Sequence, residues 1–388
     1  MSNSKFVRWI FILYLFLLCL FVYSNLNVIV LKEISILPQL TQVLVFIIAI
    51  CLILFSKVKS NNNFYKLFVA WFFCYIFLYI VTPQYNVGDI GIFRVTWFIN
   101  SFIISFICSQ KIKGAEKLLL VACYLLLLIN SYFVYCNIFT GVSVLNIQDF
   151  GVSNIVFWSF CLFPLVFLID NTLYKNIGIA IISIICLFTM KRSAFISLVV
   201  ILFFDFIRPK KTKKQINKKR KYIYIIISIV CVFILFYKFQ DQFIEIINRN
   251  LDRINSIEED RGSNRLTVWD DVLNAFNRNT LLEWIFGNGM GSTWVKARHT
   301  TAHNDFLTVF FEFGFIGVAF YLMFIYNLIR KALTEWNKQS EYVMPIISTL
   351  VILLIIGNVG DMFTCYTYLS YLTCLLGFIE GRKFYNSK

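Results

Sequence analysis

The sequence predicts an all-α, polytopic membrane protein with about 12 transmembrane helices and one large loop outside the membrane. Hydrophobic residues make up 59% of the 388 residues. Apolar stretches of roughly 17 to 22 residues recur along the chain, and each is long enough to cross ~30 Å of hydrocarbon as a helix. Positive charge is concentrated between these stretches, since residues 208–221, RPKKTKKQINKKRK, hold nine Lys and Arg and no acid.

The first apolar stretch follows Lys5 and Arg8, as the core of a signal peptide would. It is too long for a signal peptide and has no small-residue cleavage site, so we interpret it as an uncleaved first span. Similar stretches predict the other spans. In order, the twelve are residues 9–31, 36–55, 64–81, 90–108, 117–139, 153–169, 173–189, 193–207, 222–239, 304–329, 342–360 and 363–379.

These spans divide the chain into residues 1–239 with nine spans, the loop 240–303, and residues 304–388 with three spans. With both termini cytoplasmic, the basic segment 208–221 lies inside and the loop 240–303 outside, as the excess of Lys and Arg in cytoplasmic loops requires. This rule explains the net charge of +15 without nucleic acid. The alternative for the basic segment is binding of nucleic acid or acidic lipid.

The large loop contains the sequence SNRLTVWDDVLNAFNRN, which predicts an amphipathic helix. Its apolar residues have helical spacing, and Ser263 or Asn264 is the expected N-cap. Arg265 falls in the first turn, where a cation opposes the helix dipole, so an anionic partner would explain it. The apolar positions are Leu266, Trp269, Val272, Leu273 and Phe276.

The glycine cluster FGNGMGS, residues 286–292, follows that helix. Glycine-rich loops can bind phosphate through backbone N–H groups, but no βαβ unit surrounds this one. We therefore favour a tight turn that returns the chain to the membrane. The eleven cysteines lie in or at the ends of apolar spans, which predicts core side chains more than disulfides.

Charged residues inside the predicted spans gather at the outer face. Because such residues are costly in a membrane, they indicate a functional site. Lys191 and Arg192, in the turn TMKRSA, oppose the positive-inside rule, so an anion is expected beside them. The alternatives are a different number of spans or a pair of side chains that extend to the interface. The residues at the outer face are Arg94, Lys191, Arg192, Glu312 and Asp361. Asp205, near the inner end of its span, is the exception and is expected to pair with the basic segment that follows.

The two histidines, His299 and His303, both precede the tenth span. Their i, i+4 spacing could bind a metal on a helix, but the chain has no HExxH pattern and no cysteine nearby, so we expect none. Asn304 and Asp305 are expected to cap the span. Asp305 and Glu312 are seven residues apart and should share one face, which would line a polar cavity with His303 at its rim.

Four motifs together resemble the bacterial O-antigen ligase and O-antigen polymerase family. They are TMKRSAF, NRLTVWDDVL, FGNGMG and TAHNDFLTVFFEFGFIG, and they lie within a region of about residues 188–330. The resemblance implies a GT-C type glycosyltransferase of the bacterial inner membrane whose active site faces the periplasm. It implies an undecaprenyl-diphosphate-linked oligosaccharide as donor, without nucleotide sugar, cofactor or metal. It does not separate the branches of the family.

The resemblance also implies site residues. An arginine at a span end, an arginine of the periplasmic loop and the histidine of the His-Asn motif are functional in the family, and they match Arg192, Arg265 and His303. The chain departs from the family in Lys191, where Ser is common, and in Phe306, where Tyr is common. From their charge and position, we also expect Arg94 and Lys191 to bind the diphosphate and Asn304, Asp305, Glu312 and His299 to support the site.

The chemistry of glycosyl transfer suits these residue types. A base must take the proton of the attacking sugar hydroxyl, and a histidine, with an ordinary pKa of ~6.5, can do so near neutral pH. The leaving diphosphate is a poor base and needs charge stabilisation, which guanidinium groups supply without a metal. This reasoning favours His303 as the catalytic base.

Three functions remain open at this stage. A polymerase would extend the glycan on a lipid-linked repeat, a ligase would move the finished glycan to the lipid A core, and a transporter would move the lipid-linked sugar. A transporter is disfavoured because its polar groups belong near the bilayer midplane. For lipopolysaccharide or other polysaccharide biosynthesis, the expected partners are the lipid-linked oligosaccharide, membrane lipid and a chain-length regulator protein.

Overall fold

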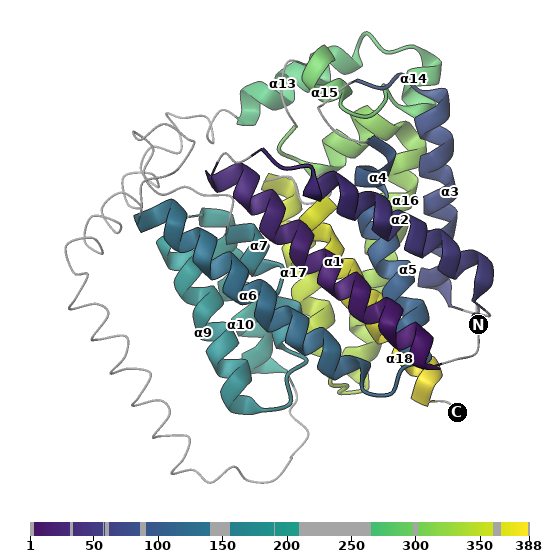
Figure 1. The fold of residues 1–388 in the computed structure, drawn as a ribbon. Helices are drawn as coiled ribbons and strands as arrows, with labels where there is room; N and C mark the ends of the chain where they lie inside the picture. The colour runs from purple at the N-terminus through teal and green to yellow at the C-terminus, as the bar shows by residue number, and fades with distance from the viewer. Residues whose placement is uncertain are drawn as a thin grey trace, which may run out of the picture.

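A computed structural model describes residues 4–31, 34–56, 58, 62–85, 91–139, 156–189, 191–208, 265–297, 302–359 and 366–386. Within these ranges every regular element is a helix (Figure 1). The predicted all-α class is therefore confirmed for the part of the chain that is described.

Helices occupy eleven of the twelve predicted spans, and the remaining span, 222–239, lies outside the described residues. Five of them, α1, α2, α3, α6 and α16, are each long and apolar enough to cross a membrane, which supports a multi-pass membrane protein. The total of twelve stays a prediction. The helices are α1 (Ser4–Leu31), α2 (Leu37–Phe55), α3 (Asn63–Val81), α4 (Gly91–Val95), α5 (Trp97–Ser109), α6 (Ala115–Phe139), α7 (Val156–Phe160), α8 (Phe163–Val166), α9 (Thr172–Phe188), α10 (Arg192–Ile207), α16 (Asp305–Asn337), α17 (Val343–Val359) and α18 (Tyr366–Asn386).

The predicted continuous span over residues 153–169 is wrong. Its described part consists of the two short helices α7 and α8, with Pro164 in the first turn of α8. Proline has no N–H to continue a helix from the preceding turn, so the backbone breaks before it. The helical stretch from 156 to 166 is only ~17 Å long at 1.5 Å per residue, which is less than the ~30 Å hydrocarbon core.

The centre of the bundle is α5, in which every residue is buried. Helix α18 packs directly on it, because Gly377 and Gly381 lie so close to the backbone of α5 that a Cβ at either position would overlap it. Phe21 of α1 also packs on α5, with its ring 4.5 Å from that of Trp97 between centroids. Close approach of small residues is how transmembrane helices gain packing contacts.

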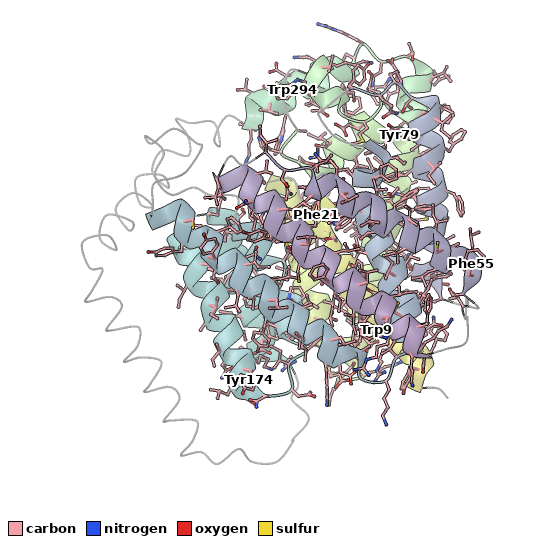
Figure 2. The ribbon with its side chains drawn as sticks, viewed as in Figure 1. Trp9, Phe21, Phe55, Tyr79, Tyr174 and Trp294 are labelled. Carbon is pink, nitrogen blue, oxygen red and sulfur yellow. The ribbon has the colours of Figure 1, made fainter. Side chains whose placement is uncertain are left out.

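The outer surface of the bundle is apolar. Trp9, Phe55 and Tyr174 point away from the core and are 70%, 63% and 54% exposed (Figure 2). Large exposed apolar side chains would be unfavourable in water, but they match the hydrocarbon of a bilayer. The surface thus supports the membrane location that the helix lengths indicate.

Three helices of the large loop, α13 (Arg265–Phe276), α14 (Leu281–Phe286) and α15 (Ser292–Lys296), cover one end of the bundle. The start of α1 and the end of α18 lie at the opposite end (Figure 1). The predicted amphipathic helix is present as α13, although its buried face consists of Val268, Val272 and Phe276. Its predicted apolar positions Leu266 and Leu273 are exposed. The expected N-caps, Ser263 and Asn264, lie outside the described residues.

We expect a cysteine introduced at Asn277, an exposed residue that follows α13, to react from outside the cell. The positive-inside rule and the position of the termini both place this residue on the outer side. Labelling intact cells with a membrane-impermeant thiol reagent, in a variant with the native cysteines replaced, measures this. A cysteine in the basic segment 208–221 should react only after lysis. Protection of the residue 277 cysteine until lysis would overturn the topology.

Candidate functional site

The tenth predicted span, 304–329, is not one continuous helix. Within α16 the backbone is non-helical at Gly314, with φ 62° and ψ −162°. A Cβ on Gly317 would overlap the side chain of Phe313 and touch Val309. Residues 305–313, which we call the short arm, therefore fold against the long segment that follows. The continuous span was expected from the apolar run, which carries no signal for this reversal except the glycine itself.

The glycine turn, residues 287–291, packs on the end of the short arm. The break at Gly314 leaves carbonyls at the arm's end without helical partners. The glycine turn supplies these partners, since Asn288 N–H donates to Phe311 O at 2.9 Å and Gly289 N–H donates to Glu312 O at 3.0 Å. The predicted tight turn is confirmed. Because these amides are bonded to carbonyls, they do not form a phosphate-binding loop.

Two glycines allow this crossing of two backbones. Gly287 has a φ of 86° and lies against the backbone of Glu312 and Phe313, while Gly314 lies against Gly287 and Ile285. A side chain at Gly287 would overlap the short arm, and L-residues rarely adopt its φ. The FGNGMG and EFGFIG motifs are thus the two halves of one backbone contact.

We expect Gly287→Ala to destabilise the protein. The strained φ alone costs about 1 to 3 kcal/mol, and the overlap with the short arm adds to it. Gly114 is a matched control, because its φ is also positive, at 74°, but nothing lies within 4 Å of a Cβ there. Thermal unfolding of the two purified variants in detergent measures the difference. Equal losses for Gly287→Ala and Gly114→Ala would show that the backbone crossing contributes nothing.

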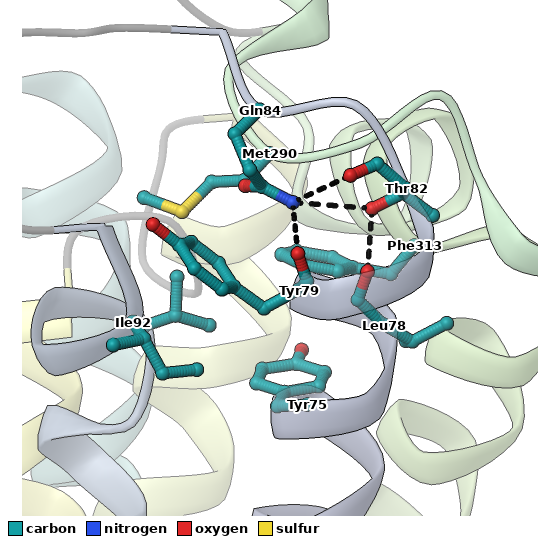
Figure 3. A pocket seen from close by; sticks show the side chains of 9 residues that line it. Tyr75, Leu78, Tyr79, Thr82, Gln84, Ile92, Met290 and Phe313 are labelled. Carbon is teal, nitrogen blue, oxygen red and sulfur yellow. Dashed lines mark hydrogen bonds between the residues drawn. The ribbon is translucent and has the colours of Figure 1, made fainter.

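The outer end of α3 lies beside the same contact (Figure 3). Gln84 donates from its side chain to the carbonyls of Tyr79 and Thr82, which closes the end of the helix. Tyr75 stacks on Phe313 with 4.7 Å between the ring centroids. Together with Met290 of the glycine turn, these residues line a small cavity. The α3 end, the glycine turn and the short arm form one packed unit.

Glu312 is held inside this unit and is only 5% exposed. The hydroxyl of Thr293 donates to its carboxylate at 3.0 Å, and backbone N–H groups of Gly291 and Thr293 also bond to it. The positive charge of Arg94 on α4 acts on the same carboxylate. Two predicted site residues, Arg94 and Glu312, therefore interact electrostatically, and Glu312 is bonded to Thr293 of α15.

Lys296 of α15 stabilises the loop by contacts with other loop residues. Its Nζ lies 2.6 Å from the Glu283 carboxylate and also bonds to Asn288. Glu283 forms a capping box with Thr280, and the hydrogen bonds from Lys296 and Thr280 lower the pKa of Glu283 from 4.5 to about 2. A lowered pKa stabilises the fold above pH 4.5, and this contribution is lost as the pH falls toward 2. The effect is small because the pair is partly exposed to water.

His303 lies at the start of the short arm. Asn304 is the N-cap, as predicted, and its side chain accepts a hydrogen bond from Leu307 N–H at 3.1 Å. Asn304 also donates to the carbonyl of Asn358 on α17 at 3.4 Å. His303 is half-buried and has a positive φ of 50°, which is uncommon for a residue with a side chain. Such strain is found where the surrounding structure fixes a residue, often at functional sites.

Asp305 is almost fully buried, at 1% exposure, and faces α17, where its carboxylate fills the space beside Gly357. Asp305 and Glu312 were expected to share a face and line one cavity. They lie on the same short arm, but they contact different elements, since Glu312 contacts α15 and Asp305 contacts α17. The arm is thus anchored by one carboxylate at each of its ends.

Helix α13 connects the loop to the histidine. The indole Nε1–H of Trp269 donates to the carbonyl of Ala302 at 2.9 Å, directly before His303. Arg265 lies one turn before Trp269 on the same face of α13, so it lies toward the same region. Lys191 is at the start of α10, with its Nζ 5.8 Å from the ring centroid of Phe157. The side chain of Arg192, all of His299 and Asp361 lie outside the described residues.

Three residues with a role here were not predicted as site residues. Trp269 was assigned only to an apolar face, although tryptophan always carries an N–H that needs a partner when buried. Thr293 binds Glu312, and Asn358 binds the cap Asn304. The only sequence signal for Asn358 is its position among polar residues that end an apolar run. No local pattern links Thr293 to Glu312.

Residues 177–322 match the family model described as O-antigen ligase. The matched region begins in α9, includes the start of α10 and the helices α13 to α15, and ends in α16 beyond the short arm. It contains all four motifs that carried the resemblance, which is therefore confirmed. A search of curated proteins finds no match to the chain.

Proposed function

On the premise that the chain is of the O-antigen ligase and polymerase type, we propose that it is an O-antigen or capsule-type polysaccharide polymerase of the bacterial inner membrane. It transfers a growing glycan from undecaprenyl diphosphate to a lipid-linked repeat unit at the periplasmic face. It does so as a GT-C type glycosyltransferase without a metal. The observation that supports the proposal is the position of His303. The N-cap Asn304 and the hydrogen bond from Trp269 to the Ala302 carbonyl fix the backbone on both sides of His303, at the end of the bundle that the loop helices cover.

In the proposed reaction, a ring nitrogen of His303 takes the proton of the acceptor hydroxyl while the hydroxyl oxygen attacks the anomeric carbon of the donor sugar. The bond between that carbon and the diphosphate oxygen breaks, and its electron pair leaves with the diphosphate. No proton is needed by this leaving group at neutral pH. Its added negative charge is stabilised instead, by Arg192 and Arg265 in first place.

Other residues support these steps by position. Asn304 fixes the start of the short arm, and Asp305 fixes the arm against α17. Glu312 anchors the arm's other end, and its carboxylate interacts electrostatically with Arg94. Arg94 and Lys191 add positive charge around the diphosphate, and His299 belongs to the segment that precedes the arm.

A ligase is the second candidate, and the match to the O-antigen ligase family model favours it. Its donor chemistry is the same, and only the acceptor differs. Transport is a weaker candidate, because the buried charged side chains among the described residues lie toward either end of the bundle. These residues are Asp305, Glu312, Lys331, Glu335 and Glu380. A transporter of a charged substrate is expected to bind it near the midplane.

A strain without the gene for this chain distinguishes these functions. We expect it to lose long glycan chains while a single repeat unit still reaches its final acceptor. Electrophoresis of the surface glycan, together with extraction of lipid-linked intermediates, measures both. Polymerised glycan that remains on undecaprenyl diphosphate would identify a ligase instead. Single repeat units that accumulate on the cytoplasmic side would identify a transporter.

A further inference from the structure

A second polar site lies at the end of the bundle opposite the candidate active site. It is a cavity of about 290 Å³ between the start of α3, the inner part of α16 and the end of α18. Two carboxylates and four cations line it. Nothing in the proposed reaction uses this cavity, because the reaction takes place at the other membrane face.

Two of the four cations neutralise the two carboxylates. Lys331 Nζ lies 2.8 Å from Glu335 and 2.7 Å from Glu380, and Lys383 Nζ lies 3.0 Å from Glu380. Asn62, the N-cap of α3, donates to the other oxygen of Glu380 at 2.7 Å. Lys331 and both carboxylates are buried. Buried charges are retained where they satisfy one another, as they do in this network.

The other two cations, Arg330 and Lys338, are exposed and lie two helical turns apart on α16. Within the described part of the chain, neither has a carboxylate within salt-bridge distance. The cavity therefore has an excess of two positive charges, and the side-chain amide of Asn63 also lines it. A guanidinium, an ammonium and neutral donors are the groups that bind a phosphate.

An apolar strip continues from the cavity along α16. Tyr326, Ile329 and Leu333 have the spacing of one helix face and are 63%, 39% and 61% exposed. Arg330 lies next to this strip in the sequence. A membrane phospholipid matches this arrangement. Its phosphate fits the charged groups near the end of α16, and its acyl chains fit the apolar strip along the side of that helix. Inorganic phosphate would use only the charged half.

We propose that this cavity binds the phosphate of an anionic phospholipid in the membrane leaflet on the side of the chain termini. Arg330 and Lys338 contact the phosphate, and the strip of Tyr326, Ile329 and Leu333 contacts the acyl chains. The Lys331, Glu335 and Glu380 network fixes the three helices that form the walls. Basic pockets between transmembrane helices bind acidic lipid headgroups in this way.

The test compares two double variants that remove the same charge from the same end of the bundle. Arg330→Gln with Lys338→Gln changes the cavity, while Lys113→Gln with Lys117→Gln changes exposed lysines near the start of α6. Native mass spectrometry of the purified full chain, titrated with phosphatidylglycerol or with phosphatidylcholine of equal chain length, measures binding. Thermal unfolding in detergent without added lipid verifies that both variants fold.

We expect the wild-type chain and the control to bind phosphatidylglycerol more tightly than phosphatidylcholine. The cavity variant should bind phosphatidylglycerol roughly thirtyfold more weakly than the wild type, since each lost charge is worth about 1 kcal/mol. Inorganic phosphate at equal concentration should not displace the lipid. Displacement by inorganic phosphate would overturn the lipid as the ligand and leave a phosphate site. Equal binding by the cavity variant and the wild type, or an equal loss in the control, would overturn the site itself.

Discussion

Replacing His303 by Ala is expected to slow glycan transfer by roughly 10² to 10⁴, the range that a positioned general base contributes. The same replacement at His299 should cost less than about tenfold. The difference follows from position, since His303 adjoins the cap Asn304 and the carbonyl bound by Trp269. Transfer by each purified variant from a lipid-linked donor, followed across a pH series, measures both effects.

His303→Asn separates catalysis from backbone strain. Asparagine tolerates the positive φ at this position but cannot act as a base near neutral pH. We expect it to lose as much activity as the Ala variant and to unfold at the wild-type temperature. Near wild-type transfer by either variant would leave His303 as a capping or binding residue.

Arg192→Lys and Arg265→Lys are expected to slow transfer by roughly 10²-fold each, in line with the loss of one preorganised donor to a developing anion. Lysine keeps the charge but loses the planar fork that binds two phosphate oxygens at once. The measurement is the transfer rate at saturating donor, with membrane expression compared for each variant. If both Lys variants formed product at the wild-type rate, other cations would have to bind the diphosphate, and Arg94 would be the first to test.

A matched control for Arg265 is Arg278→Lys. Arg278 is exposed in the turn after α13, so the substitution alters the same loop at the opposite end of that helix from Arg265. We expect Arg278→Lys to transfer glycan at the wild-type rate. If it were as slow as Arg265→Lys, the loss would reflect a general disturbance of the loop and not the lost guanidinium contact with the diphosphate.

Local features of this protein could be predicted from its sequence. The long apolar runs gave helices, because a membrane helix satisfies its own backbone hydrogen bonds and needs only length and apolar side chains. The N-cap at Asn304 and the helix of α13 also depend on neighbouring residues alone. The prediction of a continuous span over 153–169 failed because it relied on apolar composition and neglected Pro164. A proline interrupts a helix in any surroundings, because it has no backbone N–H to donate.

The features that required the structure are those that connect distant segments. Gly314 reads as an ordinary residue of an apolar helix until Gly287 is placed against it. The burial of Glu312 depends on Thr293 of another helix, and the position of His303 depends on Trp269 and Asn358. Such pairs have no fixed spacing in the chain. A sequence pattern can name their members but not their partners.

On the proposed mechanism, this chain alone transfers a glycan between lipid-linked substrates, with His303 as the base. The most direct test supplies the purified full-length protein, in lipid nanodiscs, with an undecaprenyl-diphosphate-linked repeat unit and no other enzyme. We expect a ladder of longer lipid-linked glycans, release of one undecaprenyl diphosphate for each repeat added, and loss of both in the His303→Asn variant. Intact donor after prolonged incubation with folded wild-type protein, or an unchanged ladder from His303→Asn, would contradict it.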